Sequence, residues 1–249
     1  MATGLAEVFP DFAALQARDW AGIACTKPAI MIAMTPRTGS TFLCAALHQA
    51  GLSAEPNEIL NPRGPAQQDV ERRQTPGFAA YIASFATGPD PAFIFKTGWH
   101  DAAPLASALP RLFPHLRVIY LDRKNIAAQA VSQFRAEISG IWHTRPGQGT
   151  QPFDPAGKFD LPRIRDIAAN MEQEKRSWEV WFTANHINPL RLEYRLLDTD
   201  IQEALRRIAT TMHLPLRPDL ATAGGLVKLA DAVSAEWTER VQRDMFNLS

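Results

Sequence analysis

Arg37, Gly39, Ser40 and Thr41 stand close together in the run TPRTGST, at residues 35–41. An arginine presents paired N–H donors that match a phosphate group, and a glycine lets the backbone come close to it. Hydroxyl groups at the start of a helix add donors where the helix N-terminus already favours an anion. These residue types at this spacing therefore predict a loop that binds a phosphate.

The same run excludes the commonest phosphate loop. A Walker A motif requires G-x-x-x-x-G-K-[ST], whereas residues 35–41 hold a single glycine and no lysine. The sequence also offers no obvious carboxylate at the end of a later strand to hold magnesium. An ordinary strand-to-helix turn capped by Ser40 or Thr41 stays open as the alternative at this point.

The segments around the loop predict the elements that position it. Ala29–Met34 is an apolar run, as in a strand buried on both faces, and apolar residues recur at helical spacing after Thr41. Further short strands are predicted over 92–96, 117–121 and 190–194. The alternation of strands and helices predicts an α/β, P-loop-like three-layer fold, in which helices flank a short parallel sheet. The helices are expected near residues 12–20, 40–50, 65–86, 101–109, 125–139, 163–186, 199–213 and 228–246.

The carboxyl ends of parallel strands meet along one edge of a sheet, where ligands bind. Lys96 ends the second predicted strand, Arg123 follows the third, and Ser132 lies in the helix after it. With Arg37, they would place three cations around one crevice in a protein whose 26 basic and 26 acidic residues balance. This arrangement predicts a small polyanionic ligand. A solvated cation at a strand end is the alternative for Lys96 and Arg123.

The whole-chain properties are those of a globular protein of 249 residues, 46% apolar and 21% charged. The balanced charge argues against a nucleic-acid groove. No apolar run approaches the ~20 residues of a membrane span, and the N-terminus lacks the basic region of a secretory signal, so a cytoplasmic protein is expected. Two cysteines without metal spacing fit a reduced compartment. We expect one domain over 1–249, with a lead-in segment at 1–28 and a long loop at 144–162 that would serve as a lid over the acceptor.

Three blocks of the sequence resemble the Stf0-type (trehalose 2-sulfotransferase-like) family of bacterial sulfotransferases. They are TPRTGSTFLCAAL at the loop, PNEIL after the following helix, and LDRKNIAAQAVSQFRAEISGIWH from the third strand onward. The segment FKTGWH is similar as well, and the resemblance extends over most of residues 29–245.

The resemblance implies that the polyanion is 3′-phosphoadenosine 5′-phosphosulfate (PAPS), a co-substrate that is used without a metal. It assigns the 3′-phosphate of PAPS to Arg123 and Ser132, and the phosphosulfate group to the loop. The loop residues concerned are Arg37, Thr38, Gly39, Ser40 and Thr41.

The resemblance also implies the catalytic residues. Glu58 of PNEIL matches the family's proposed base, and His100 is the second candidate for that role. Arg37 and Lys96 supply the catalytic cations.

The acceptor is expected to contact Glu58, Trp142 and His143. The family usually continues past the glutamate with an aromatic pair, whereas this chain has Ile59 and Leu60. A more aliphatic acceptor pocket is expected from that difference.

Together these observations predict a sulfotransferase that moves the sulfuryl group of PAPS by in-line displacement to a hydroxyl of a small molecule, sugar or glycolipid. A nucleotide-dependent kinase with a degenerate phosphate loop is the rival enzyme, and Asp122 is the one carboxylate well placed to hold its metal. A relative that binds nucleotide without catalysis is the rival of another class. Family members often pair, so a homodimer is also open.

Overall fold

The computed structural model describes residues 4–52, 56–63, 65–87, 89–142, 154–155, 157–215 and 232–246. Its elements, in chain order, are α1 (Leu5–Val8), α2 (Phe12–Ala17), β1 (Ala29–Met34), α3 (Ser40–Gln49), α4 (Pro65–Arg73), α5 (Phe78–Ser84), β2 (Phe93–Gly98), α6 (Trp99–Ala102), η1 (Ala103–Leu105), α7 (Leu109–Leu112), β3 (Leu116–Asp122), α8 (Ile126–Ser139), α9 (Leu161–Ala184), β4 (Leu190–Glu193), α10 (Tyr194–Thr199), α11 (Ile201–Met212) and α12 (Ala232–Phe246).

The four strands of this sheet lie in the order β2-β1-β3-β4, and every neighbouring pair is parallel. All six residues of β1 are buried, as expected of an apolar strand between two neighbours and two layers of helices. The register places Met34 beside Gly98 of β2 and Leu121 of β3. The predicted carboxyl ends therefore do meet at one edge, and the loop at residues 35–39 leaves the sheet there.

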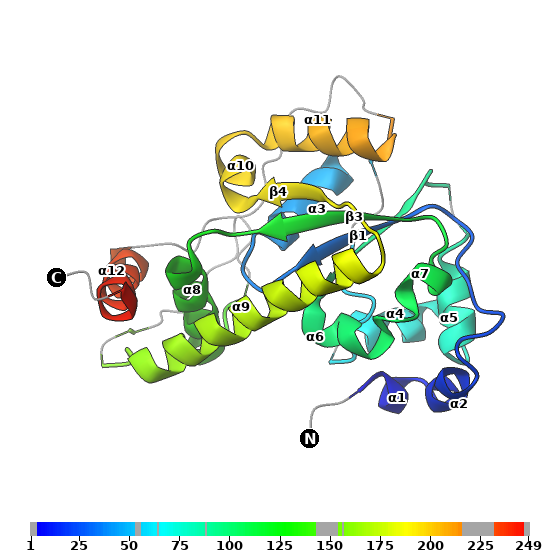
Figure 1. Ribbon diagram of the computed structural model, residues 1–249, viewed down its shortest axis with the longest axis horizontal. Coiled ribbons are helices and arrows are strands. Elements are labelled where there is room, and N and C mark those ends of the chain that lie inside the picture. Colours follow the sequence, from blue (N-terminus) through cyan, green and yellow to red (C-terminus); the bar gives the residue numbers. More distant parts are fainter. Residues whose placement is uncertain are drawn as a thin grey trace.

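Helices cover both faces of the sheet, which confirms the predicted three-layer α/β fold (Figure 1). On one face, Met31 and Tyr120 pack with Trp178 of α9 and with the short helices α4 to α7. On the other face, Ile32 packs with Leu43 of α3 and with α10 and α11. Trp178 and Trp181 are core residues, as expected from their spacing on the long helix.

A third cluster of apolar side chains ties α8 to the C-terminal helix. Phe134 of α8, Ile167 of α9 and Trp237 of α12 are buried together. Figure 1 shows α12 packed beside α8, away from the sheet. The helix that carries Ser132 is therefore held from two sides.

The boundaries of several predicted elements were wrong by a few residues. The second strand is Phe93–Gly98, so it extends past Lys96, and Tyr194 begins α10 instead of ending β4. The helix expected at 101–109 is divided into α6, η1 and α7, because prolines at 104 and 110 interrupt the backbone hydrogen bonds of a continuous helix.

The lead-in segment is part of the core. Phe9, Phe12 and Trp20 are buried, and the rings of Phe12 and Trp20 pack against each other and against Phe78 of α5. The Asp11 carboxylate accepts backbone N–H groups at the start of α5, which a helix N-terminus leaves without partners of its own.

Most of the loop predicted at 144–162 lies outside the described residues. Its last two residues belong to α9, which begins at Leu161 with Asp160 as its N-cap: the Asp160 carboxylate accepts the N–H of Arg163. Pro162 fits there because backbone N–H groups in the first turn of a helix have no partner within the helix, so a proline without an N–H loses no hydrogen bond. Within the described ranges, no helix combines the length and the apolar character needed to cross a membrane.

Candidate functional site

The loop between β1 and α3 has two residues with a left-handed backbone conformation. Arg37 and Gly39 have φ of 65° and 81°, in the left-handed region that non-glycine residues rarely adopt. A Cβ atom at Gly39 would lie 2.9 Å from Cδ2 of Tyr194, so a larger residue does not fit. The Thr38 hydroxyl donates to the Thr35 carbonyl at 3.0 Å, and both residues are buried. Glycine is therefore required at position 39 by conformation and by space.

Two guanidinium groups meet above this loop. Arg37 Nε donates to Ser132 Oγ at 3.0 Å, and its Nη1 donates to the Trp142 carbonyl at 2.6 Å. Arg123 Nη1 donates to the backbone carbonyl of Arg37 at 3.1 Å, and its guanidinium lies 4.5 Å from the ring centre of Tyr194. The predicted donor residues Arg37, Arg123 and Ser132 are thus brought together.

The electrostatics of this pair favour an anion. Burial lowers the pKa of Arg37, and the nearby charge of Arg123 lowers it further. Burial also lowers the pKa of Arg123. Among the described residues, neither arginine forms an ion pair with a carboxylate, and the nearby charge of Asp198 offsets only part of the effect of burial on Arg123. Both cations therefore lack a full compensating charge. A bound phosphate would supply that charge.

A second group of charges lies at the carboxyl end of β2. Lys96 Nζ donates to Thr41 Oγ1 at 2.9 Å and lies 3.2 Å from Glu58 Oε1. The other oxygen of Glu58 accepts from Asn61 Nδ2 at 2.8 Å. The Lys96 side chain is only 8% exposed, whereas that of Glu58 is 26% exposed. The buried lysine thus links Glu58, the predicted base, to the loop at residues 35–41, which is predicted to bind the sulfuryl donor and is called the donor loop below. Glu58 itself keeps access to solvent.

The comparisons with known proteins identify the class of this chain. The family model described as Stf0 sulphotransferase matches residues 101–244, which is more than half of the sequence. The chain belongs to the Stf0 sulfotransferase family. It is a sulfotransferase enzyme that moves a sulfuryl group, as the resemblance in the motifs predicted.

This Stf0 sulfotransferase has curated relatives of nearly full length. It is 25% identical to the trehalose 2-sulfotransferase of Mycolicibacterium smegmatis, over 87% of this chain and 95% of that protein. It is 24% identical to the trehalose 2-sulfotransferase of Mycobacterium tuberculosis, over 88% of this chain and 95% of that protein.

Solved structures share its fold at low identity. The sulfotransferase domain of the curacin biosynthetic pathway superposes with a TM-score of 0.51 at 13% identity, covering 85% of this chain and 83% of that one. The sulfotransferase domain of the Synechococcus PCC 7002 olefin synthase gives 0.50 at 14% identity, covering 81% and 78%.

The rival kinase reading needed Asp122 as a metal ligand. In the structure of this chain, Asp122 Oδ1 lies 2.8 Å from Lys175 Nζ, and the same Lys175 Nζ donates to the Arg123 carbonyl at 2.9 Å. No group of three or more His, Cys, Asp or Glu side chains among the described residues is arranged to hold a metal ion. Asp122 is therefore engaged in an ion pair with Lys175, and the match to the Stf0 family does not favour the kinase.

Gln129 is a site residue that the sequence analysis missed. It is fully buried on α8, and its Nε2 donates to Thr35 Oγ1 and to the Pro36 carbonyl, both at 2.7 Å. It thereby holds the first half of the donor loop. The signal available in the sequence was its position three residues before Ser132, which places both side chains on one face of a helix.

Asp101 lies near Glu58, and Glu174 lies near Asp101. Asp101 of α6 is 3.4 Å from Arg63, and burial raises its pKa. Burial, followed by the charge of Asp101, raises the pKa of Glu174 on α9 to about 7. Glu174 belongs to no sequence motif, and it lies near Asp101 only because α9 packs against α6.

Three predicted site residues remain to be placed: His100, Trp142 and His143. His100 is exposed on α6 next to Asp101. The Trp142 side chain is 43% exposed, and its backbone carbonyl is the group that contacts Arg37. His143 lies outside the described residues.

Ile59 and Leu60 correct one expectation. They are 2% and 0% exposed and pack in the core beneath the sheet, so they do not make an aliphatic acceptor pocket.

Proposed function

We propose that this Stf0 sulfotransferase transfers the sulfuryl group of PAPS to a hydroxyl of a carbohydrate, by in-line displacement and without a metal ion. The observation that carries the proposal is the pair of desolvated guanidiniums, Arg37 and Arg123, whose like charges lie near each other at a glycine-containing loop. PAPS carries anionic groups at two positions of its ribose, which suits two adjoining cationic subsites.

The donor side would be divided between these subsites. Ser132 accepts a hydrogen bond from Arg37, so its own hydroxyl hydrogen is free to donate to a 3′-phosphate beside Arg123. Arg37 and the N–H groups of residues 38–41 would bind the phosphosulfate. Donors of this kind stabilise the negative charge that develops on a leaving phosphate, and removing one typically costs about 10²–10³ in rate.

The acceptor side would be governed by Glu58. As the acceptor oxygen bonds to sulfur and the bond from sulfur to the phosphate oxygen breaks, Glu58 takes the hydroxyl proton. Lys96, 3.2 Å from Glu58 and 2.9 Å from Thr41, holds the carboxylate in an ion pair and adds positive charge beside the loop. Adenosine 3′,5′-bisphosphate and a sulfate ester are the products.

A carbohydrate is favoured as the acceptor on two grounds. The curated relatives are trehalose 2-sulfotransferases. The described surroundings of Glu58 are also polar, since Asp101 and Arg63 lie beside it and offer several hydrogen-bonding groups to a polyhydroxyl molecule. We place the enzyme in the cytoplasm, which fits its two buried cysteines, Cys25 and Cys44.

The test is an incubation with sulfur-labelled PAPS against separate pools of disaccharides, glycolipids and phenols, with EDTA present. Transfer to the carbohydrate pool supports the proposal. Transfer only to phenols overturns the acceptor class, and phosphoryl transfer from ATP with magnesium overturns the donor. No turnover with any pool, together with binding of adenosine 3′,5′-bisphosphate, favours a non-catalytic relative.

A further inference from the structure

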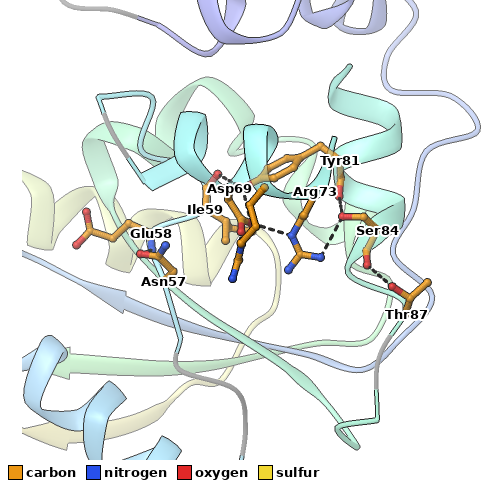
Figure 2. A network of polar contacts seen from close by, with 9 residues as sticks. Asn57, Glu58, Ile59, Asp69, Arg73, Tyr81, Ser84 and Thr87 are labelled. Carbon is orange, nitrogen blue, oxygen red and sulfur yellow. Dashed lines mark hydrogen bonds and ion pairs between the residues drawn. The ribbon is translucent and has the colours of Figure 1, made fainter. Parts of the chain in front are cut away.

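The segment that carries Glu58, residues 56–63, is irregular, yet buried contacts hold it on both sides of Glu58. Before Glu58, the Asn57 carbonyl accepts the backbone N–H of Lys96 at 3.1 Å. After it, the Ile59 carbonyl accepts the Tyr81 hydroxyl at 3.1 Å. Figure 2 shows the Glu58 carboxylate pointing away from Tyr81, on the far side of Ile59. These two bonds therefore restrain the backbone on either side of Glu58.

Tyr81 is well fixed for this contact. The residue is fully buried on α5, and its ring packs against Phe9 and Phe85 at 5.0 Å and 4.9 Å between ring centres. Burial and the nearby Asp69 carboxylate raise the pKa of the Tyr81 hydroxyl well above its usual range, so it stays a donor at any working pH. Its single hydrogen is shared between the Ile59 carbonyl and Asp69 Oδ2, 3.3 Å away.

Asp69 is itself held in place by α4. It is 3% exposed, forms an ion pair with Arg73 at 3.0 Å and a second one with Arg72. Arg73 also donates to Ser84 Oγ at 3.4 Å, and Ser84 Oγ donates to the Tyr81 carbonyl at 2.7 Å. The network in Figure 2 thus returns to Tyr81 and fixes both ends of the residue.

We infer that Tyr81 is a positioning residue for Glu58, holding its backbone through the Ile59 carbonyl so that the carboxylate meets the acceptor hydroxyl. This inference rests on the proposed role of Glu58 as the base. A displacement of a reacting group by about 1 Å can cost 10²-fold in rate, so a hydrogen bond one residue away has a kinetic effect that its contribution to stability alone would not produce.

The first test compares Tyr81→Phe with Tyr120→Phe. Tyr120 is a second tyrosine buried in the same core cluster, and its described contacts lie on β3, α9 and Arg191, away from residues 56–63. Both changes remove one hydroxyl from a buried tyrosine of this cluster. Tyr81→Phe should lower kcat by about 10-fold with the KM for PAPS unchanged, whereas Tyr120→Phe should leave kcat near that of the wild type. Equal kcat values for the two variants overturn the inference.

The second test repeats Tyr81→Phe in a Glu58→Gln background. A residue that acts through Glu58 has little further effect once the base is gone, because coupled changes are not additive. An undiminished 10-fold loss in that background shows that Tyr81 acts elsewhere and overturns the inference. Full activity of Glu58→Gln alone instead overturns the base assignment, an outcome that leaves sulfuryl transfer itself intact.

If the Tyr81→Phe variant does not fold, Arg73→Met provides a substitute test. Without Arg73, Asp69 draws the Tyr81 hydrogen away from Ile59, so kcat should fall in the wild-type background and not with Glu58→Gln. An equal fall in both backgrounds, or none in either, counts against the inference.

Discussion

Arg37 and Arg123 share one side of the site, and Glu58 and Lys96 share the other. The two sides differ in what their charges contact. Lys96 and Glu58 neutralise each other at 3.2 Å, whereas Arg37 bonds to a hydroxyl and a carbonyl. This difference fits the proposal that the arginines bind an anionic donor and that the glutamate faces a neutral acceptor.

Substitution of Arg123 tests the donor side. Arg123→Ala should weaken binding of adenosine 3′,5′-bisphosphate by about 10–150-fold, the equivalent of ~1.5–3 kcal/mol for a lost charge-assisted hydrogen bond. Binding of adenosine 5′-phosphate should change far less. Calorimetric titration measures both, and Lys124→Ala is the control because the Lys124 side chain is 77% exposed. An equal loss for the two nucleotides would remove Arg123 from the 3′-phosphate.

Substitution of Glu58 tests the acceptor side. Glu58→Gln keeps the size of the side chain but removes its basicity, so turnover should fall by about 10²–10⁴ while donor affinity is kept. His100→Ala should retain most of the activity, since His100 is exposed on α6. The reverse pattern in initial-rate assays would transfer the role of base to His100.

At this scale the sequence indicated part of the candidate site and missed Gln129 and Glu174. Arg37, Arg123 and Ser132 could be grouped because each follows a strand end or lies one helix beyond it. Gln129 could not, because its importance comes from contacts with the Thr35 hydroxyl and the Pro36 carbonyl of the loop. Such contacts depend on how helices pack and leave no motif.

The donor loop, as an element, depends on the fit between Gly39 and α10. Tyr194 is the first residue of α10, and its ring lies against the Gly39 backbone and beneath Arg123. The loop is therefore supported from below by an aromatic side chain and from the side by Gln129. The strand and helix flanking the loop were predictable from apolar periodicity, whereas the start of α10 at Tyr194 was not, because LRLEY also suits a strand.

Two glycines offer a matched comparison of this support. Gly39 and Gly140 have similar φ of 81° and 71°, but a Cβ at Gly140 would meet nothing within 4 Å. Gly140→Ala should cost about 1 kcal/mol for the left-handed conformation alone. Gly39→Ala should cost about 2–4 kcal/mol because the overpacking against Tyr194 adds to that strain, and it should weaken nucleotide binding. If urea unfolding shows an equal loss of unfolding free energy for the two variants, the Tyr194 ring moves aside at no energetic cost.

The molecule as a whole buries one carboxyl group that no ion pair compensates among the described residues. Glu174 lies on α9 between the sheet and α6, and burial raises its pKa from 4.5 to about 7. The folded state therefore binds more protons than the unfolded state between these pH values. Since stability falls wherever the folded state binds more protons, the free energy of unfolding should decrease as pH rises through this window.

The size of the pH effect is limited to about 3 kcal/mol, at about 1.4 kcal/mol for each unit of pKa shift. The raised pKa of Asp101 acts in the same direction. Glu174→Gln should make the protein more stable at pH 8 than the wild type and flatten the decline between pH 5 and 7. Thermal unfolding across pH measures this, with Glu172→Gln as a control on the exposed side of α9. A decline that is unchanged in Glu174→Gln would assign it to other groups.

The overall architecture was predictable because short apolar strands alternating with helices admit few arrangements. The lead-in segment was not assigned to the core, although Phe9, Phe12 and Trp20 are buried there. Apolar residues in short helices lack the repeated periodicity that marks a longer one, and their burial depends on partners in α5 that are distant in the sequence.

The bond between Asn57 and Lys96 has a consequence beyond the placement of Glu58. β2 is an edge strand, and an uncovered strand edge tends to pair with another chain. The Asn57 carbonyl occupies the outward N–H of Lys96 on that edge. Loosening residues 56–63 thus uncovers an aggregation-prone edge as well as misplacing a carboxylate. Selection for solubility and selection for turnover would act on this short segment in the same direction.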